Sequence, residues 1–159
     1  MKTRLFCLLM AIFLLAGCGK ETTEHTVALD ELSFTLPSSF IDVSQEHADT
    51  QQAFMFAQGN IYINGFKESK EELHNYFEFI SLDAYVQMFC ENNFTDLPAQ
   101  RNNDIWNIVY TADVEGEEYT FLCLFYETES HFWRVQACCP TANFAENHQE
   151  LWNYIASAD

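Results

Sequence analysis

Between residues 27 and 66, short runs of apolar residues are separated by polar turn residues. This pattern predicts two β-hairpins. The expected strands are Val27–Leu29, Leu32–Leu36, Ala53–Ala57 and Ile61–Phe66. Asp30-Glu31 separates the first two, and Gln58-Gly59-Asn60 separates the last two, as turn residues do between paired strands. Between the hairpins, the segment from Phe40 to Asp49 is expected to be a loop with Phe40 and Ile41 in the core.

The spacing of apolar residues changes from strand-like to helical after Ser69. Ser69-Lys70-Glu71-Glu72 matches a capping box, and Ser81 is a second candidate N-cap where the helical phase resets. Pro140-Thr141 predicts the start of a last helix. The predicted inner faces are Leu73, Tyr76, Phe77 and Ile80; then Leu82, Tyr85, Val86 and Phe89 with Cys90 alongside; and finally Phe144, His148, Leu151, Trp152 and Ile155.

Three longer runs predict a meander of strands over Ile105–Val114, Tyr119–Glu127 and His131–Cys139. With turns at Glu115-Gly116 and Thr128-Glu129, paired positions should add up to 231 in the first hairpin and to 257 in the second. One face would then carry Trp106, Ile108, Tyr110, Phe121, Cys123, Phe125 and Phe132, and the other Val109, Leu122, Leu124, Trp133, Val135 and Cys139.

Because both faces of the meander are apolar, the sheet should be covered on both sides. The sequence therefore predicts an α+β fold. We expect an antiparallel sheet of about five to seven strands, including the C-terminal meander, with helices packed on both faces as an α/β/α sandwich. Residues 27–159 should form this single domain.

The first 17 residues have the features of an export signal. Lys2 and Arg4 precede an apolar run from Leu5 to Leu15, which is too short to span a bilayer as a helix. An ordinary secretory signal would have small residues before its cleavage site, and Leu15 fits that poorly. Leu15-Ala16-Gly17-Cys18 instead resembles the lipobox of bacterial lipoproteins.

The lipobox resemblance implies a signal peptide over residues 1–17, cleavage before Cys18 and a diacylglycerol on the Cys18 thiol, with acyl chains such as palmitate and a further N-acyl chain in some envelopes. Two or three acyl chains anchor a protein stably, at about 0.8 kcal/mol for each buried CH₂ group. Residues 18–26 would be the lipidated cysteine and a flexible polar tether. The expected location is the cell envelope, either on the outer side of the cytoplasmic membrane or on the outer membrane.

Acidic residues outnumber basic ones, and the net charge is −17. Removal of the leader takes away two basic residues, so that the mature chain is more acidic still. Such a surface repels phosphate backbones, which argues against nucleic acid as a partner. The expected partners are membrane lipid through Cys18 and an unidentified protein or small molecule.

Four cysteines remain in the predicted domain: Cys90, Cys123, Cys138 and Cys139. Outside the cytoplasm they could form disulfides, act in redox chemistry or bind a soft metal, and they could equally be buried small hydrophobic residues. Neighbouring side chains on a strand point to opposite faces, so Cys138 and Cys139 cannot readily chelate one ion together. In the expected register Cys123 lies opposite Arg134, four residues from Cys138, which is too far for a disulfide. A disulfide from Cys90 to Cys123, or to one of Cys138 and Cys139, stays geometrically open.

Other residues that can carry chemistry form no recognisable catalytic motif. His131 and His148 lack zinc-binding spacing, and His148 is expected to be a buried core residue; no metal site or cofactor is predicted. Carboxylates gather around Gly116, namely Asp113, Glu115, Glu117 and Glu118, and are best explained as a solvated turn. Tyr62 and Trp106 are candidates for a binding groove near sheet edges, with core packing as the simpler explanation.

The order of elements resembles the small bacterial lipoproteins of the PsbP-like, or DcrB-like, superfamily. The resemblance rests on the leader, on "FTLPSSF" (Phe34 to Phe40) and on "FWRVQACCPTANFAENHQELW" (Phe132 to Trp152). It implies an antiparallel sheet between helices and a non-catalytic binding or accessory role, with no catalytic residues to transfer. A thiol-based redox or metal-binding lipoprotein using the four cysteines is the alternative, and a small hydrolase with an acidic site is a third hypothesis.

Overall fold

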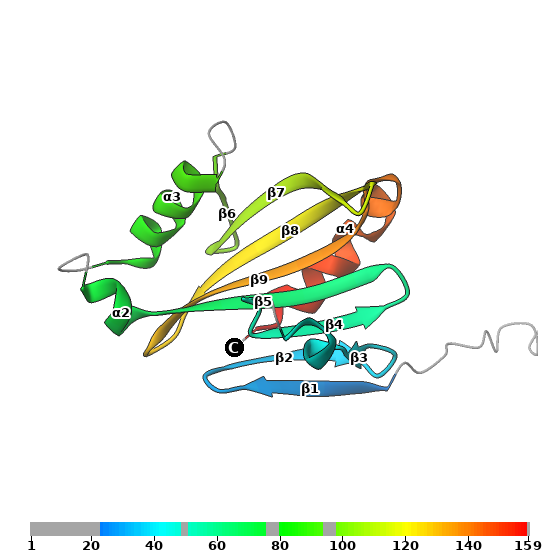
Figure 1. Ribbon diagram of the computed structural model, residues 1–159, viewed down its shortest axis with the longest axis horizontal. Helices are drawn as coiled ribbons and strands as arrows, with labels where there is room; N and C mark the ends of the chain where they lie inside the picture. Colours follow the sequence, from blue (N-terminus) through cyan, green and yellow to red (C-terminus); the bar gives the residue numbers. More distant parts are fainter. Residues whose placement is uncertain (1–22, 49–50, 76–79, 94–97, 159) are drawn as a thin grey trace, which may run out of the picture.

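The computed structural model describes residues 23–48, 51–75, 80–93 and 98–158, and within them the chain forms two antiparallel sheets and three α-helices (Figure 1). The larger sheet has seven strands in the order β3-β4-β5-β9-β8-β7-β6, and β1 and β2 form a separate hairpin. The strands are β1 (Glu24–Leu29), β2 (Leu32–Pro37), β3 (Ile41–Asp42), β4 (Phe54–Gln58), β5 (Ile61–Ser69), β6 (Gln100–Asn102), β7 (Ile105–Val114), β8 (Glu117–Glu127) and β9 (His131–Pro140). The helices are the 3₁₀ helix η1 (Ser44–His47), α2 (Lys70–His74), α3 (Leu82–Asn93) and α4 (Thr141–Ala156). The predicted α+β class is confirmed.

The first hairpin is longer than the sequence pattern indicated. β1 begins at Glu24, where Glu24 pairs with Pro37, and Asp30 adopts the left-handed conformation (φ 47°) that the two-residue turn requires. The prediction of a flexible tether extending to residue 26 is therefore wrong over its last three residues. Those residues are polar, but their backbone groups pair with β2, whose apolar side chains hold the hairpin on the core. Residues 18–22 lie outside the described part of the chain.

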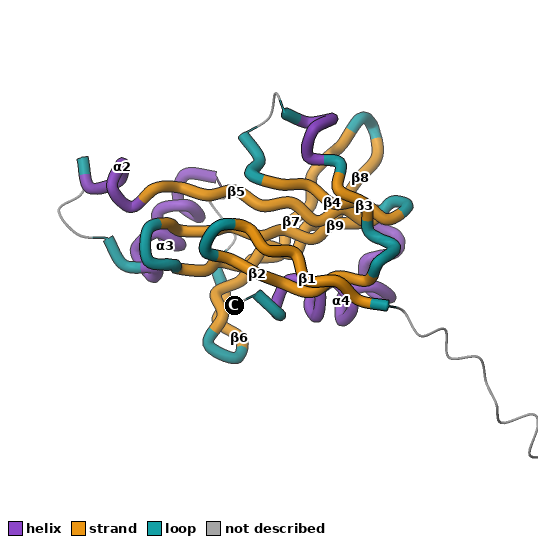
Figure 2. The backbone as a smooth tube through the Cα atoms, turned by 90° about the horizontal axis from the view of Figure 1, so that it is seen from below, coloured by secondary structure: helices purple, strands orange, loops and turns teal. Residues whose placement is uncertain are grey.

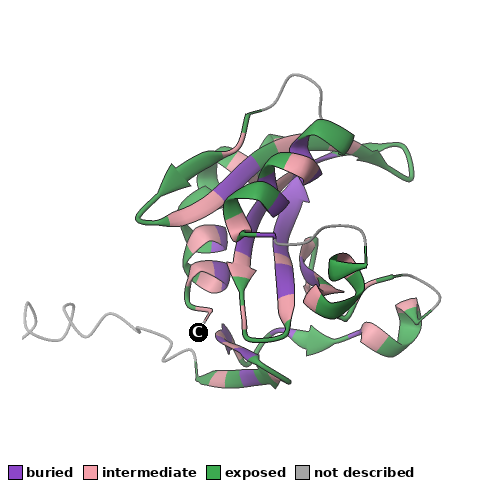
Figure 3. Ribbon diagram, turned by 90° about the vertical axis from the view of Figure 1, so that its left-hand side faces the viewer, coloured by how far each residue is buried: buried purple, intermediate pink, exposed green. Residues whose placement is uncertain are grey.

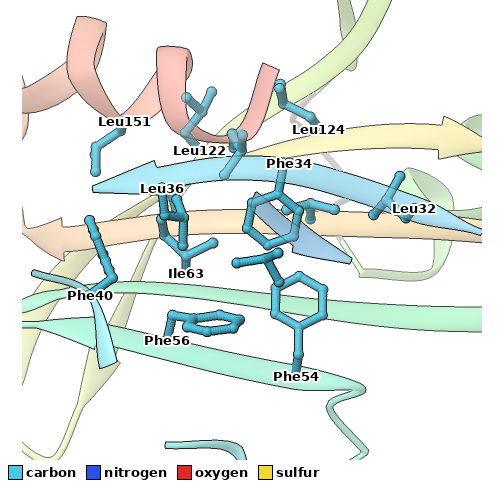
Figure 4. Packing of buried hydrophobic residues seen from close by; sticks show 14 of the residues in the cluster. Leu32, Phe34, Leu36, Phe40, Phe54, Phe56, Ile63, Leu122, Leu124 and Leu151 are labelled. Carbon is cyan, nitrogen blue, oxygen red and sulfur yellow. The ribbon is translucent and has the colours of Figure 1, made fainter. Parts of the chain in front are cut away.

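One face of the seven-stranded sheet is covered by α4 together with the β1–β2 hairpin, which is drawn in front of the larger sheet in Figure 2. The core between these layers contains Phe34, Leu36, Phe54, Ile63, Leu122, Leu124, Trp133, Val135, Leu151 and Ile155, and several of them are seen in Figure 4. Each of these side chains is at most 2% exposed. At roughly 1.5–3 kcal/mol for each large apolar side chain, this core is the main source of stability.

The other face of the sheet is covered only over part of its area, by α3. Tyr85, Val86, Phe89 and Cys90 on α3 pack against Ile108, Cys123, Phe125 and Phe132 of the sheet. The stacked rings of Tyr85 and Phe132, with centroids 4.7 Å apart, lie at the centre of this contact. The inner face predicted for this helix and the two faces predicted for the meander are confirmed. In Figure 3 the buried residues run along the central strands, between exposed outer surfaces.

The register of the meander is as predicted in its first hairpin and differs in its second. Trp106 pairs with Phe125, which adds up to 231. In the second hairpin Glu127 pairs with Phe132, so that partners add up to 259 and not to 257. The turn residues are 129–130, one position later than expected, because Thr128 N–H donates to the carbonyl oxygen of His131 and closes the turn there. A shift of two residues keeps every side chain on its predicted face.

The N-caps predicted at Ser69 and Ser81 are confirmed. Ser69 accepts a hydrogen bond from Glu72 N–H, and the Ser81 hydroxyl from Ala84 N–H. Part of the predicted first helix, residues 76–79, lies outside the described residues.

Two side chains do not lie where the sequence pattern placed them. His148 is exposed on α4, because Leu151 and Ile155 alone turn fully inward, and its ring contacts that of Phe144. Ile41 is 62% exposed, since it lies on the short edge strand β3.

Among the helices of the described residues (23–48, 51–75, 80–93 and 98–158), none has both the length and the apolar character needed to cross a bilayer.

Candidate functional site

An open cleft of about 450 Å³ lies on the same face of the sheet as α3, beside the area that this helix covers. Its floor comes from β5, β8 and β9, one wall from η1 and β4, and the other from the turn between β7 and β8. The lining residues are His47, Gln52, Met55, Tyr62, Asn64, Val114, Glu115, Glu117, Tyr119, Phe121 and Cys138. A concave site with aromatic walls and a few polar groups is typical of small-ligand binding.

Strand register creates the aromatic floor of the cleft. Tyr62 pairs with Cys138 and Cys138 with Phe121, so these three side chains lie in one row across the sheet. Phe121 is stacked on Tyr110 of the next strand, with ring centroids 5.0 Å apart and planes within 5°. The Tyr62 and Tyr119 rings lie 6.2 Å apart. These contacts hold the rings in place before any ligand arrives.

Asn64 places a buried amide in the same cleft. It lies two residues after Tyr62 on β5, and therefore on the same face, and it is only 8% exposed. Its amide atoms are not among the fully buried polar atoms that lack a partner in the described residues, and they border the open cleft. The cleft is the open space beside this amide, so a ligand bound there would be within its reach.

The wall formed by the β7–β8 turn is acidic. Glu115 and Gly116 take up left-handed conformations (φ 55° and 91°), and Gly116 N–H donates to Asp113 Oδ1 at 3.0 Å. Glu115 and Glu117 line the cleft, while Glu118 pairs with Asp113 on the other side of the ribbon. All four carboxylates are exposed, as predicted for a solvated turn. No lysine or arginine is among the lining residues.

The structure separates the four domain cysteines into three environments. Cys90 and Cys123 lie in the α3 cluster, Cys138 lies in the cleft floor, and Cys139 lies in the core beneath α4. All four are buried free thiols. The corrected register places Cys123 opposite Gln136, two residues from Cys138 and not four.

Burial raises the pKa of each of these thiols. It raises the pKa of Cys123 and of Cys138 to about 12, and it raises the pKa of Cys90 and Cys139 as well. The thiolate is the reactive form of cysteine, so a raised pKa makes a thiol a poor nucleophile and a poor metal ligand at neutral pH. These environments favour the buried-hydrophobe interpretation of the four cysteines over redox or metal chemistry.

A polar cluster that the sequence did not single out joins the β1–β2 turn to the β8–β9 turn. Glu31 accepts hydrogen bonds from the Thr128 hydroxyl at 2.5 Å and from the Ser130 hydroxyl at 2.7 Å. The Ser130 hydroxyl also lies 2.7 Å from His131 Nδ1, and His131 Nδ1 is 3.5 Å from Glu31. The same ring nitrogen faces both the serine and the carboxylate, so the imidazole cannot relay a proton between them as in a catalytic triad. The hydrogen bonds to Glu31 hold its pKa low, at about 2. This cluster is a latch between two turns.

The remaining candidates from the sequence lie in different parts of the molecule. Tyr62 lies in the cleft, which favours the binding interpretation for it. Trp106 instead packs at the α3 side, where its Nε1–H donates to Asp83 Oδ1 at 2.7 Å and Arg101 lies over its ring. His131 belongs to the latch and His148 to the exposed surface of α4. Within the described residues no three metal-ligating side chains come together.

A second open pocket, of about 420 Å³, lies between the first hairpin and α4. Glu24, Thr35, Asn153 and Tyr154 are among its lining residues. Tyr154 OH donates to Glu150 on the same helix, and burial raises the pKa of this tyrosine. Asn153 and Tyr154 hydrogen-bond to residues one turn away on α4, whereas Gln58 Oε1 is buried without a partner among the described residues. The pocket lacks the aromatic floor of the cleft.

Comparison with known protein families gives no match, and neither does comparison with curated protein sequences.

Solved structures of similar fold exist. A crystal structure from Bacteroides thetaiotaomicron VPI-5482 is similar at a TM-score of 0.52 and 16% identity, over 87% of this chain and 48% of that one. This chain therefore spans about half the length of that protein. The solution structure of cyanobacterial PsbP (CyanoP) from Synechocystis sp. PCC 6803 matches at a TM-score of 0.49 and 11% identity, over 91% of this chain and 95% of that chain.

The crystal structure of LpqN, described as involved in cell envelope biogenesis of Mycobacterium tuberculosis, matches at a TM-score of 0.47 and 11% identity, over 86% of this chain and 89% of that chain. A PsbP protein is thus among the structures that this chain resembles. At these identities the likeness is one of fold.

Proposed function

We propose that this protein is a lipid-anchored extracytoplasmic binding protein, whose domain holds a small ligand in the cleft and carries out no catalysis. The observation that supports this most is the cleft itself, in which aromatic rings fixed by strand pairing lie next to the largely buried side chain of Asn64. An amide at the edge of such a cleft can exchange hydrogen bonds with a bound ligand.

The anchor rests on the sequence of the leader. Leu15-Ala16-Gly17-Cys18 resembles a lipobox, and a diacylglycerol on Cys18 would hold the domain at the membrane surface. The non-catalytic role is supported by the raised pKa of Cys138, the nucleophile present in the cleft floor.

Ligand binding is tested on the full-length protein in a non-ionic detergent, by a thermal-shift screen against a library of small metabolites. Compounds that stabilise the wild type are then measured against Tyr62→Ala, which removes part of the cleft floor, and against Phe144→Ala, a matched aromatic truncation on α4. We expect the first variant to bind at least about tenfold more weakly and the second to bind as the wild type does. Equal binding by all three proteins would contradict the cleft as the site.

Anchoring is tested by fractionation and mass spectrometry of the mature protein. We expect the wild type in the membrane fraction with the mass of a lipid on Cys18, and Cys18→Ser without that lipid. An unlipidated wild-type protein would refute the anchor and leave the cleft proposal standing.

A further inference from the structure

The side chains around the cleft are unevenly charged, and this bears on which ligand the cleft takes. Two carboxylates, Glu115 and Glu117, stand on one wall, and the lining residues include no lysine or arginine to neutralise them. The whole chain has a net charge of −17, so the field at the cleft mouth attracts cations from a distance as well. An anionic ligand would be repelled at every stage of approach.

The floor beside these carboxylates consists of aromatic faces. Tyr62, Tyr119 and Phe121 line it, and Phe121 is held flat against Tyr110. The face of an aromatic ring is electron-rich and attracts organic cations, while the ring also offers apolar contact to a carbon skeleton. Aromatic faces next to carboxylates are thus complementary to an organic ammonium group attached to an apolar body.

A third observation is independent of the charges. Asn64 is more than nine-tenths buried and lines the cleft. Its amide can both donate and accept hydrogen bonds, so it suits a ligand with a polar group and distinguishes the cleft from a purely apolar groove. A bare metal ion fits poorly, since no three ligating side chains converge in the part of the chain that the structure describes.

We propose that the ligand of the cleft is a small organic amine in its ammonium form, with an apolar or aromatic body that lies on Tyr62, Tyr119 and Phe121. The ammonium group would face Glu115 and Glu117, and a polar group of the ligand would reach Asn64. This inference rests on the proposed function, because it names the ligand class of the same cleft.

Three probes of nearly equal size separate charge from shape. Tyramine is a phenol with an ammonium group, 4-ethylphenol is its neutral counterpart, and 3-(4-hydroxyphenyl)propionate is an anionic one. Isothermal titration of the full-length protein in non-ionic detergent measures each affinity. We expect tyramine to bind roughly tenfold more tightly than 4-ethylphenol, with the propionate weakest, and we expect added salt to weaken tyramine binding selectively.

Charge variants on the same turn supply the matched control. The single variants Glu115→Gln and Glu117→Gln should each weaken tyramine binding about threefold and leave 4-ethylphenol unchanged. Glu118→Gln removes the same charge one residue away, on the face that does not line the cleft, and should have little effect. All three positions are exposed, so that folding is not at risk.

Equal affinity for the three probes, preference for the propionate, or no binding of any probe would overturn the ammonium assignment. Equal weakening by Glu118→Gln would overturn it too, because the effect would then come from overall charge. The proposed function fails on a different result, namely library compounds that bind the wild type and Tyr62→Ala alike.

Discussion

Gly65 lies on β5 directly opposite Phe54 of β4, and the Phe54 ring occupies the space where a side chain would begin. A Cβ atom at position 65 would lie 2.1 Å from Phe54 Cε1 and 2.5 Å from Cζ, well inside van der Waals contact. The ring cannot move away freely, since Phe54 is 2% exposed and packs against Phe34 and Trp133. Glycine is therefore required here by packing and not by backbone conformation.

We expect Gly65→Ala to lower the free energy of unfolding by about 2 kcal/mol or more, because a well-packed core must shift to admit the methyl group. Gly59→Ala is the comparison, since Gly59 has open space around it and only a positive φ of 59° to maintain. That variant should cost about 1 kcal/mol. Urea unfolding followed by circular dichroism measures both, and a smaller effect at position 65 than at position 59 would show that the ring yields.

Thiol chemistry gives a second prediction at the scale of single residues. Burial raises the pKa of all four domain cysteines, so the folded domain should react with iodoacetamide at pH 8 at least about tenfold more slowly than the same domain in guanidinium chloride. Mass spectrometry of the alkylated protein counts the modified residues. Rapid modification of any one of them in the folded protein would revive the redox alternative.

Among the elements, the first hairpin is fastened to the sheet through the latch around Glu31. The hydrogen bonds from Thr128 and Ser130 favour the ionised carboxylate and lower its pKa from 4.5 to about 2. A group whose pKa is lower in the folded state stabilises the fold above its unfolded pKa. That contribution is complete above pH 4.5 and disappears as the pH falls through about 2.

Glu31→Gln should therefore be less stable than the wild type at pH 7, and the difference should shrink as the pH falls from 4.5 towards 2. Urea midpoints across this range measure the effect. Glu129→Gln, at an exposed acid of the same turn, should follow the wild type throughout. A difference between Glu31→Gln and the wild type that does not change with pH would mean that the charge of Glu31 plays no part.

The elements themselves were largely predictable from local patterns. Capping by Ser69 and Ser81, the inner face of α3 and the register of the β7–β8 hairpin all follow from residues close together in the sequence. The register of the β8–β9 hairpin could not be predicted in this way, because the hydrogen bond from Thr128 to His131 decides which two residues form the turn. The position of the turn depends on backbone geometry, and several combinations of turn residues satisfy that geometry equally well.

The candidate site was only partly predictable, for a related reason. The cleft joins η1, β5 and the β7–β8 turn, which are far apart in the sequence, and no spacing rule connects His47, Tyr62 and Glu115. Tyr62 could be selected as an aromatic near a sheet edge, and the carboxylates could be selected as a cluster. Their meeting depends on the strand order and on how far α3 extends over the sheet. The same distance in sequence explains why Glu31 was not linked with Ser130.

At the scale of the whole molecule, the surplus of acidic residues works against compactness. A net charge of −17 brings many carboxylates together when the chain folds, and the described ion pairs are few and at least partly exposed. We expect the melting temperature to rise with added sodium chloride, as screening weakens the repulsion. Differential scanning calorimetry measures this directly. A melting temperature that falls with salt would show that specific ion pairs outweigh the general repulsion.

The last helix shares one core with the first hairpin. Leu151 and Ile155 of α4 are fully buried beside Phe34 and Leu36, and Tyr126 OH donates to the carbonyl oxygen of Ile155. Until α4 has been made, the sheet face that it covers together with the first hairpin remains partly exposed. The domain can therefore complete its folding only after nearly the entire chain has left the ribosome, because its most distant segments must meet. On the export route proposed above, that delay keeps the chain extended and able to thread through a narrow channel, and folding then takes place on the far side.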